Sequence, residues 1–358
     1  MKVLLLARYG HLAASSRYRV YQYQPSLRDH GLDVTVCALL DDVYLRRLYA
    51  GQRAAPIRIA RAYAGRILAI LQAGGYDLIW LEKEALPWIP AWLESLLLGL
   101  GPPVVVDYDD AIHHRYDHHA SLPFRTLLGG KIARIMRNAA VVVVANDYLA
   151  TYARKAGAAR IEYLPTVVDL HRYPPAPPPA NDVFTVGWIG NPLTAPVYLE
   201  AIHPVLKELC KGGRARFVAI GPTVLDWPDV PVTVKSWSEA TETEDIQRLD
   251  VGLMPLPDEP FERGKSGLKL LQYMACSRPV IASPVGVNQE IIEEGVNGFT
   301  ATSPREWLDT LRLLQSDQEL RRRMGQAGRA MVEDRYCLQV TAPRLADILT
   351  SVSREHTV

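Results

Sequence analysis

Residues 261–299 read FERGKSGLKLLQYMACSRPVIASPVGVNQEIIEEGVNGF, the most informative stretch of the chain. Lys265 and Lys269 flank Gly267 just before an amphipathic segment, which predicts a helix over 268–276. The apolar run PVIA then predicts a buried strand, and SPVGVN follows it as a second loop of small residues. A flexible glycine, two ammonium groups and a helix N-terminus together suit a diphosphate. Two solvated lysines beside ordinary helix–strand packing would give the same pattern, so both interpretations stay open here.

The same strand-then-helix pattern continues in both directions from this stretch. Short β-branched runs alternate with helical segments along most of the chain, which implies parallel sheets with right-handed crossovers. The predicted strands are residues 3–7, 33–39, 77–81, 103–107, 141–145, 184–189, 216–220, 232–234, 251–255 and 279–282. The predicted fold class is therefore α/β, with two tandem doubly wound (Rossmann-like) domains facing each other across a cleft.

A proline-rich segment, HRYPPAPPPAND at 171–182, interrupts this alternation. Five prolines cannot continue a helix or a central strand, so we expect an extended linker and a domain boundary. An exposed loop inside one domain is the alternative. The expected division is 1–172 for the first domain, 173–181 for the linker, 182–336 for the second domain and 337–358 for a C-terminal helix that packs back on the first domain.

The composition of the 358-residue chain excludes several classes of protein. A net charge of +1 gives no general basic field for nucleic acid. The four cysteines are scattered without a CxxC pair, which excludes a disulfide scaffold and fits a reducing compartment. The apolar run at the N-terminus is too short for a signal peptide, and prolines break the apolar stretch 85–100. We therefore expect a cytoplasmic protein.

The densest polar cluster is DYDDAIHHRYDHH at 107–119, which begins at the end of a predicted strand. Three interpretations are open. A DxD pair and the histidines could bind a metal, although an arginine replaces the glutamate of an HExxH motif. Asp109, Asp110 and His113 could instead serve as acid–base or substrate-hydroxyl contacts. The third interpretation is that Asp109 or Asp110 caps a short helix whose exposed face carries the histidines.

Two further loops join a predicted strand to a helix. The first contains Gly10, Ser16 and Arg17, and the second contains Gly190, Asn191 and Thr194. Each predicts a helix start, capped by Ser15 or Ser16 in the first loop and by Thr194 in the second, which could bind a phosphate or carboxylate. A plain capped helix explains each of them equally well.

Residues 43–76 contain no acidic side chain but six arginines, from Arg46 to Arg66. The pattern predicts an amphipathic helix with a basic face, which could lie on an anionic membrane surface. A solvated helix whose arginines pair with distant carboxylates is the alternative.

The segment QYMACSRPVIASPVGVNQEIIEEGVNGF (272–299) resembles the donor-site signature of family four GT-B glycosyltransferases (glycosyl transferases group 1). The preceding GKSGLKLLQ falls where that family has EGFGLPxLE. LPTVVD at 164–169 resembles the family's turn at the domain junction, and YDDAIHHRYD resembles a bacterial branch of it. The positions in step with the signature are Gly267, Leu268, Ala275, Pro279, Val280, Gly286, Glu290, Ile292, Gly295 and Gly298.

This resemblance implies a cytoplasmic, peripheral membrane enzyme of cell-envelope polysaccharide synthesis. It would transfer a hexose, with retention, from a nucleoside diphosphate sugar to a lipid-linked or polysaccharide acceptor, with neither a metal nor another cofactor. The second domain would bind the donor and the first the acceptor. Asp109, Asp110 and His113 become the candidate catalytic residues, and Gly10, Ser16 and Arg17 the acceptor or phosphate loop. The implied donor-binding residues are Gly190, Asn191, Thr194, Trp237, Lys265, Gly267, Lys269, Gln272 and Glu290.

The chain departs from the family pattern at the paired glutamates of EGFGLPxLE. Gly264 and Gln272 stand in their places, and Glu262 is two residues away from the first. In the family, one glutamate contacts the donor sugar and the other the ribose. This departure keeps two alternatives open: a sugar-nucleotide epimerase of the same fold, and a noncatalytic subunit that binds a sugar nucleotide.

Overall fold

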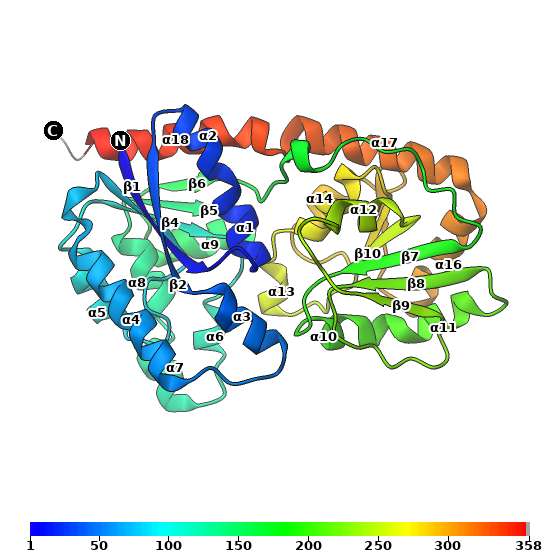
Figure 1. Cartoon of the computed structure of the whole chain (residues 1–358), viewed down its shortest axis with the longest axis horizontal. Helices are drawn as coiled ribbons and strands as arrows, with labels where there is room; N and C mark the ends of the chain where they lie inside the picture. Colours follow the sequence, from blue (N-terminus) through cyan, green and yellow to red (C-terminus); the bar gives the residue numbers. More distant parts are fainter. Residues whose placement is uncertain (356–358) are drawn as a thin grey trace. The chain divides into compact units, whose positions relative to one another are not determined.

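The computed structural model describes residues 1–355, which fold into two compact units, each built on a six-stranded parallel sheet (Figure 1). The first unit comprises residues 1–166, 263–266 and 338–355. The second comprises 167–262 and 267–337. Two tandem doubly wound α/β units are thus confirmed. Within 1–355, no helix is both long and apolar enough to span a bilayer.

The first sheet has the order β2-β1-β3-β4-β5-β6, and all of its paired strands are parallel. Because the winding direction reverses between β1 and β3, the loops at their carboxyl ends diverge and leave room for side chains and ligands. The strands are β1 (Lys2–Tyr9), β2 (Asp33–Leu40), β3 (Leu78–Glu82), β4 (Val104–Tyr108), β5 (Val141–Val144) and β6 (Ile161–Tyr163).

Helices cover both faces of this sheet, and α18 lies alongside α2 (Figure 1). Tyr23 and Thr341 join these parts through their hydroxyl groups, 2.9 Å apart. The helical segments are α1 (Ala14–Arg19), η1 (Tyr21–Tyr23), α2 (Gln24–Asp29), α3 (Asp42–Tyr49), α4 (Pro56–Leu71), η2 (Ala73–Gly75), α5 (Ala91–Leu98), α6 (His114–Asp117), α7 (Leu122–Leu128), α8 (Lys131–Asn138), α9 (Asp147–Ala156) and α18 (Leu338–Glu355).

The second sheet has the order β12-β11-β10-β7-β8-β9 and is also parallel. Its winding reverses between β7 and β10, so the crevice beside the carboxyl ends of these two strands is the expected ligand position. The strands are β7 (Phe184–Ile189), β8 (Ala215–Ile220), β9 (Val232–Lys235), β10 (Val251–Met254), β11 (Val280–Ala282) and β12 (Gly298–Thr300).

The helices of the second unit pack an apolar core against this sheet, with Trp188 and Phe217 fully buried in it. Gly325 and Gly328 let α17 approach α14 closely, since a methyl group at Gly325 would lie 2.0 Å from the carbonyl oxygen of Ser277. The helical segments are η3 (Leu170–Arg172), α10 (Ala195–Leu199), η4 (Glu200–Ile202), α11 (His203–Cys210), α12 (Glu242–Gln247), α13 (Pro260–Arg263), α14 (Leu268–Ala275), α15 (Asn288–Ile291), α16 (Pro304–Ser316) and α17 (Gln318–Arg335).

The proline-rich segment is extended and belongs to the second unit, whereas the chain passes from one unit to the other at 166–167. Arg278 donates to the carbonyl of Pro177 at 2.8 Å, and Gln247 donates to that of Pro174 at 3.0 Å. Prolines offer carbonyl acceptors but no N–H groups, so side chains of the second unit hold this segment in place.

Candidate functional site

In the second unit, the loop after β7 is shaped by Asn191. Its Oδ1 accepts hydrogen bonds from the backbone N–H groups of Leu193 (2.9 Å) and Thr194 (3.0 Å). The expectation that Thr194 caps the next helix is wrong, because its hydroxyl donates to the carbonyl of Asn191 instead. A side-chain oxygen that accepts from backbone N–H groups two and three residues ahead forms an Asx turn, and here it fixes the turn before α10.

Gly190 is required by the packing of Trp188. A Cβ at this position would lie 2.1 Å from the Trp188 ring, which is far inside van der Waals contact. The glycine N–H donates to the carbonyl of Ile220 at 3.0 Å, which ties the loop to β8. The indole of Trp188 therefore reaches the carboxyl edge of the sheet in a fixed position.

Four side chains from four elements meet at this edge, and we call them the Lys269 cluster: Trp188, Tyr198, Glu262 and Lys269. The Lys269 Nζ lies 5.3 Å from the ring centroid of Trp188 and 5.9 Å from that of Tyr198. The Tyr198 hydroxyl donates to Glu262 Oε1 at 2.8 Å. Cation–π contacts hold the ammonium group of Lys269 over these two rings at the carboxyl edge of the sheet.

The N-terminus of α14 adds backbone donors to this cluster. Gly267 precedes the helix with φ +70°, and its backbone takes the cap position without a side-chain hydrogen bond. A Cβ there would lie 2.5 Å from Ile291 Cδ1, so only glycine fits. The first-turn N–H groups of an eight-residue helix and the charge of Lys269 together suit a phosphate.

Lys265 and Lys269 belong to different units, because residues 263–266 are part of the first unit. Asn146 Nδ2 donates to the carbonyls of Gly264 (3.0 Å) and Lys265 (3.2 Å). Gly264 is packed so closely that a Cβ would lie 2.4 Å from the Cβ of Ala111. The sequence pattern placed the two lysines in one site, whereas the structure assigns them to different units.

Gln272 is buried, and its Nε2 donates to the Tyr173 hydroxyl at 3.2 Å. That hydroxyl donates to Glu242 Oε1 at 2.7 Å, and the Trp237 indole donates to Glu242 Oε2 at 2.6 Å. The amide of Gln272 thus lies inside a network of protein hydrogen bonds. Half-buried Trp237 follows β9, and exposed Glu290 lies in the first turn of α15.

In the first unit, Lys83 organises the predicted catalytic aspartates. Its Nζ lies 2.8 Å from Asp109 Oδ1 and 3.3 Å from Asp110 Oδ2. Burial acts to raise the pKa of Asp110, but the charges of Lys83, Lys265 and Arg115 outweigh it and lower this pKa to about 2. Asp110 is therefore ionised at neutral pH and can accept hydrogen bonds only.

His113 is buried beside these aspartates and stacks on Tyr152, with ring centroids 3.7 Å apart. Burial, helped by the nearby His114 and His118, lowers its pKa to about 3, so the imidazole is neutral. The helix-cap interpretation of the aspartates is wrong, because α6 begins after His113 and has no side-chain cap.

One group in the part of the chain that the structure describes brings metal-ligand atoms close together. Ligand atoms of His113, His114 and Asp117 lie within 4.8 Å of one another. His114 is engaged at both nitrogens, however: Nδ1 lies 3.0 Å from Asp117 Oδ1, and Nε2 lies 2.7 Å from the Tyr148 hydroxyl. Its ring is held by protein groups on both sides.

The predicted acceptor or phosphate loop differs from expectation. Ser16 is fully buried, and its hydroxyl donates to the Glu82 carboxylate at 2.8–2.9 Å, so it neither caps α1 nor faces a ligand. Arg17 is also buried and donates to the carbonyl of His11 at 2.9 Å. Gly10 is packed against the carboxylate of Asp42. The hydroxyl of Ser16 is therefore held by the buried carboxylate of Glu82.

The sequence analysis missed the buried charged residues at the end of β3. Glu84 pairs with Arg8 at 2.6 Å and with Lys131 at 3.1 Å. Burial lowers the pKa of Arg66 and raises the pKa of Glu82. Three consecutive charged residues, Glu82 to Glu84, directly after an apolar strand were the pattern that could have revealed this network.

The basic face expected between Arg46 and Arg66 is only partly present. Arg66 is buried and donates to the carbonyls of Ala7 and Cys37, so it cannot contact a membrane. Arg58 pairs with Asp41 at 2.5 Å on the surface. Arg66 lies on the face of α4 that packs against the sheet, which hydrophobic periodicity alone does not reveal for a long side chain.

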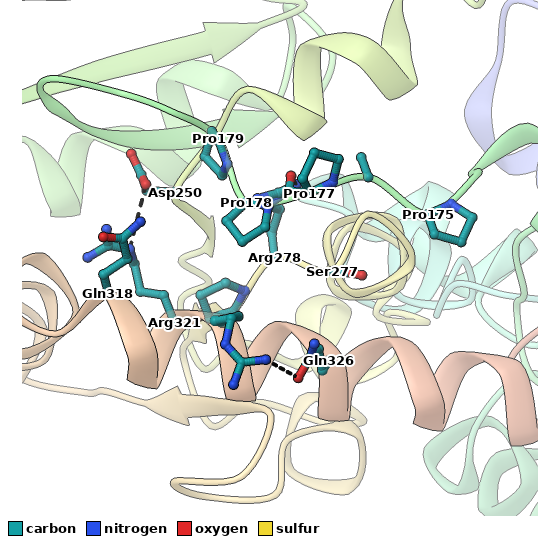
Figure 2. A pocket seen from close by; sticks show the side chains of 13 residues that line it. Pro175, Pro177, Pro178, Pro179, Asp250, Ser277, Arg278, Gln318, Arg321 and Gln326 are labelled. Carbon is teal, nitrogen blue, oxygen red and sulfur yellow. Dashed lines mark hydrogen bonds and ion pairs between the residues drawn. The ribbon is translucent and has the colours of Figure 1, made fainter.

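A cavity of about 290 Å³ lies elsewhere in the second unit, and Figure 2 shows it between the proline-rich segment and α17. Asp250 and Pro279, which directly precede β10 and β11, are among its lining residues. The cavity is therefore at the amino ends of the strands, away from the Lys269 cluster.

The comparison with known proteins concerns the part of the chain that carries the Lys269 cluster. Residues 180–317 match the family model for glycosyl transferases group 1. Most of the second unit is thus similar to this family. The group 1 segment contains the whole Lys269 cluster and the loops after β7 and β10, so the resemblance noted in the sequence is confirmed.

Individual glycosyltransferases are also similar to the chain. A D-inositol 3-phosphate glycosyltransferase from Kineococcus radiotolerans is 26% identical over 206 residues, which is 47% of this chain and 46% of that protein. An uncharacterised glycosyltransferase from Methanocaldococcus jannaschii is 37% identical over 65 residues, 18% of each chain. The chain thus spans less than half the length of these curated relatives.

Solved structures agree over nearly the whole chain. HepE of Anabaena, in complex with UDP-glucose, superposes with a TM-score of 0.72 at 18% identity and covers 98% of this chain and 100% of its own. Sucrose-phosphate synthase from Thermosynechococcus elongatus gives 0.73 at 15% identity, with 98% and 99% covered. At such identities the likeness establishes the fold alone, so the expected GT-B fold is confirmed.

Proposed function

We propose that the protein is a glycosyltransferase that moves a hexose from a nucleoside diphosphate sugar to an acceptor, with the donor bound by the second unit. The single observation that carries this proposal is the Lys269 cluster within the group 1 segment, beside the helix N-terminus at Gly267. The sugar nucleotide named in the HepE complex, UDP-glucose, supports a donor of the same class.

In this proposal, the diphosphate binds at the start of α14 and pairs with Lys269. The departing diphosphate gains charge as the glycosidic bond breaks, so a fixed ammonium group there lowers the barrier. Asn191 and Gly190 shape the loop on one side of the donor, and Trp237 flanks the base. Lys265 is the second candidate cation for the diphosphate.

Glu262 takes the place of the family glutamate that contacts the donor sugar. Its carboxylate lies in the Lys269 cluster and accepts from Tyr198 at 2.8 Å, which leaves further lone pairs for sugar hydroxyls. The support is positional, since Glu262 is the acidic residue of the cluster that already holds Lys269.

The first unit binds the acceptor, a lipid-linked sugar or a polysaccharide. Asp110, kept ionised beside Lys83, accepts a hydrogen bond from a hydroxyl, and neutral His113 orients it. Neither group then forms a covalent intermediate, and transfer with retention requires only that they position the substrates. The proposal includes no metal or other cofactor. It places the enzyme in the cytoplasm, where it takes part in the synthesis of cell-envelope polysaccharide.

A thermal-shift screen against nucleoside diphosphate sugars, with UDP-glucose as the first probe, tests the proposal. A donor present at 100 times its Kd stabilises the protein by about 2.7 kcal/mol. Lack of any shift across uridine, guanosine, adenosine and thymidine diphosphate sugars would contradict donor binding. A changed sugar in the absence of acceptor would indicate an epimerase. Binding without hydrolysis or transfer across an acceptor panel would indicate a noncatalytic subunit.

A further inference from the structure

The first unit exposes six large apolar side chains around α5 and α7, which we call the apolar patch. Between 46% and 63% of each residue is exposed. Trp88 and Phe124 join the two parts, with ring centroids 6.4 Å apart. Soluble proteins rarely gather so many large side chains in one exposed place unless something covers them. The patch consists of Trp88, Trp92, Leu96, Leu122, Phe124 and Leu127.

Helix α5 buries its charged side chain and exposes large apolar ones, which is the reverse of an ordinary surface helix. Its one ionisable side chain, Glu94, is fully buried, where it pairs with Lys131 at 2.8 Å and accepts from the N–H of Ala85 at 2.6 Å. Trp92 and Leu96, one turn apart, are exposed instead. A helix beside water normally places its charges outward, so the outer face of α5 is suited to an apolar environment.

The backbone also holds Trp88 in an outward position at a conformational cost. Its φ of +63° is strained for a bulky residue. Carbonyls around it are fixed by hydrogen bonds: Lys131 Nζ donates to Leu86 (2.5 Å) and Ile89 (2.8 Å), and the Tyr63 hydroxyl donates to Pro87 (2.8 Å). The turn is therefore rigid, and the half-exposed indole is a built feature of it.

The segment that carries α7 and α8 has charged side chains of one sign. Residues 118–146 contain no aspartate or glutamate, and they include exposed Arg125 on α7 and Arg134 on α8. Asp117, just before this stretch, lies against the rings of His114 and His118. Exposed arginines beside tryptophan and leucine match a surface that is apolar inside and anionic at its headgroups.

We propose that the apolar patch docks on an anionic lipid bilayer, with Trp88 and Trp92 at the level of the headgroups and the leucines among the acyl chains. Tryptophan favours this level because its ring is apolar and its N–H is polar. This surface replaces the Arg46–Arg66 face, from which buried Arg66 is withdrawn. The proposal does not depend on the glycosyltransferase function, since docking requires no sugar donor.

Co-sedimentation of the full chain with phosphatidylglycerol/phosphatidylcholine vesicles tests it. The wild-type protein is expected to bind, and the triple variant Trp92→Gln/Leu96→Gln/Leu127→Gln to lose about tenfold or more in partitioning, since each lost apolar contact weakens insertion. The matched control is Val224→Gln/Leu313→Gln, which removes exposed apolar groups from the second unit and should leave partitioning unchanged.

A second pair of variants separates the charge from the apolar contact. Arg125→Gln/Arg134→Gln should weaken binding to anionic vesicles and reduce its salt dependence, with little effect on neutral vesicles. Circular dichroism melts of all variants check that they fold. Absence of wild-type binding to either vesicle type would overturn the proposal, as would equal losses in the control. A wild-type dimer that the triple variant converts to monomers, without vesicle binding, would assign the patch to a protein interface instead.

Discussion

Lys83 Nζ lies 2.8 Å from Asp109 Oδ1 and 3.3 Å from Asp110 Oδ2, so one ammonium group at the end of β3 holds two consecutive carboxylates at the end of β4. Lys83 and Asp109 are both buried, and the lysine backbone has a φ of +66°. Aspartates side by side repel each other, and the shared cation makes their joint ionisation possible.

Replacement of Lys83 by Met should destabilise the protein by about 3–5 kcal/mol, because it leaves a buried carboxylate without its counter-ion. Urea denaturation measures this free energy of unfolding. The double variant Lys83→Met/Asp109→Asn should recover a large part of the loss. If the single variant is as stable as the wild type, the ion pair does not matter for stability.

Replacement of Lys269 by Ala should weaken nucleoside diphosphate binding by about 1.5–3 kcal/mol, the range for a charge-assisted hydrogen bond. Isothermal calorimetry with UDP provides the measurement. Lys207→Ala is the matched control, since it removes an exposed lysine of the same unit that pairs with Asp229. Lys265→Ala tests the other candidate lysine under the same conditions. Unchanged affinity would remove the altered lysine from the site.

Replacement of Glu262 by Gln should lower the transfer rate about tenfold or more while UDP affinity changes little, because the carboxylate would contact the sugar and not the diphosphate. The size corresponds to one lost charge-assisted hydrogen bond in the transition state. A radiolabelled transfer assay beside UDP calorimetry separates the two effects. Equal loss of both would instead indicate that Glu262 maintains the shape of the cluster through Tyr198.

Acidification should destabilise the protein through His113. Its pKa is about 3 in the folded state, below the ordinary 6.5, so the unfolded chain binds the extra proton first. Stability from this group is complete above pH 6.5 and declines as the pH falls toward 3, by at most about 1.4 kcal/mol per pH unit. His113→Phe, which keeps the stacking on Tyr152, should flatten the slope in urea titrations at several pH values. The exposed control His171→Gln should keep it, and identical slopes in all three proteins would refute the assignment.

The same Gly-to-Ala change should have opposite effects in two helices. Gly65 in α4 has open space where a methyl group would go, so Gly65→Ala should stabilise by about 0.5–1 kcal/mol. Gly325→Ala in α17 should destabilise by about 1–3 kcal/mol, because the methyl group would meet the carbonyl oxygen of Ser277 at 2.0 Å. Thermal unfolding compares the two, and stabilisation by both variants would contradict the close approach of α17.

The two sheets were predictable because buried parallel strands are continuous apolar runs such as Val141–Val144. The short strands β6 and β12 were missed, since three residues give too little pattern. Gly267 and Lys269 were recognised through local spacing. Tyr198 was not, because its contact with Glu262 joins residues 64 positions apart.

Partnerships between distant residues also explain the errors. Ser16 was expected as a cap or a phosphate contact from its place near a helix start, but its hydroxyl donates to the carboxylate of Glu82. Thr194 was expected as a cap because threonine often is one, yet its hydroxyl donates to the carbonyl of Asn191. Composition near a helix start identifies residues that can cap, and only the three-dimensional neighbours decide which one does.

Residues 263–266 and the chain from 338 onward complete the first unit, although most of the second unit separates them from residue 166. A fragment cut at the proline-rich segment would therefore lack α18 and the loop that Asn146 binds. Neither half can be produced faithfully as a single contiguous piece. Chimeras that exchange acceptor specificity with a relative would have to transplant three separate stretches together.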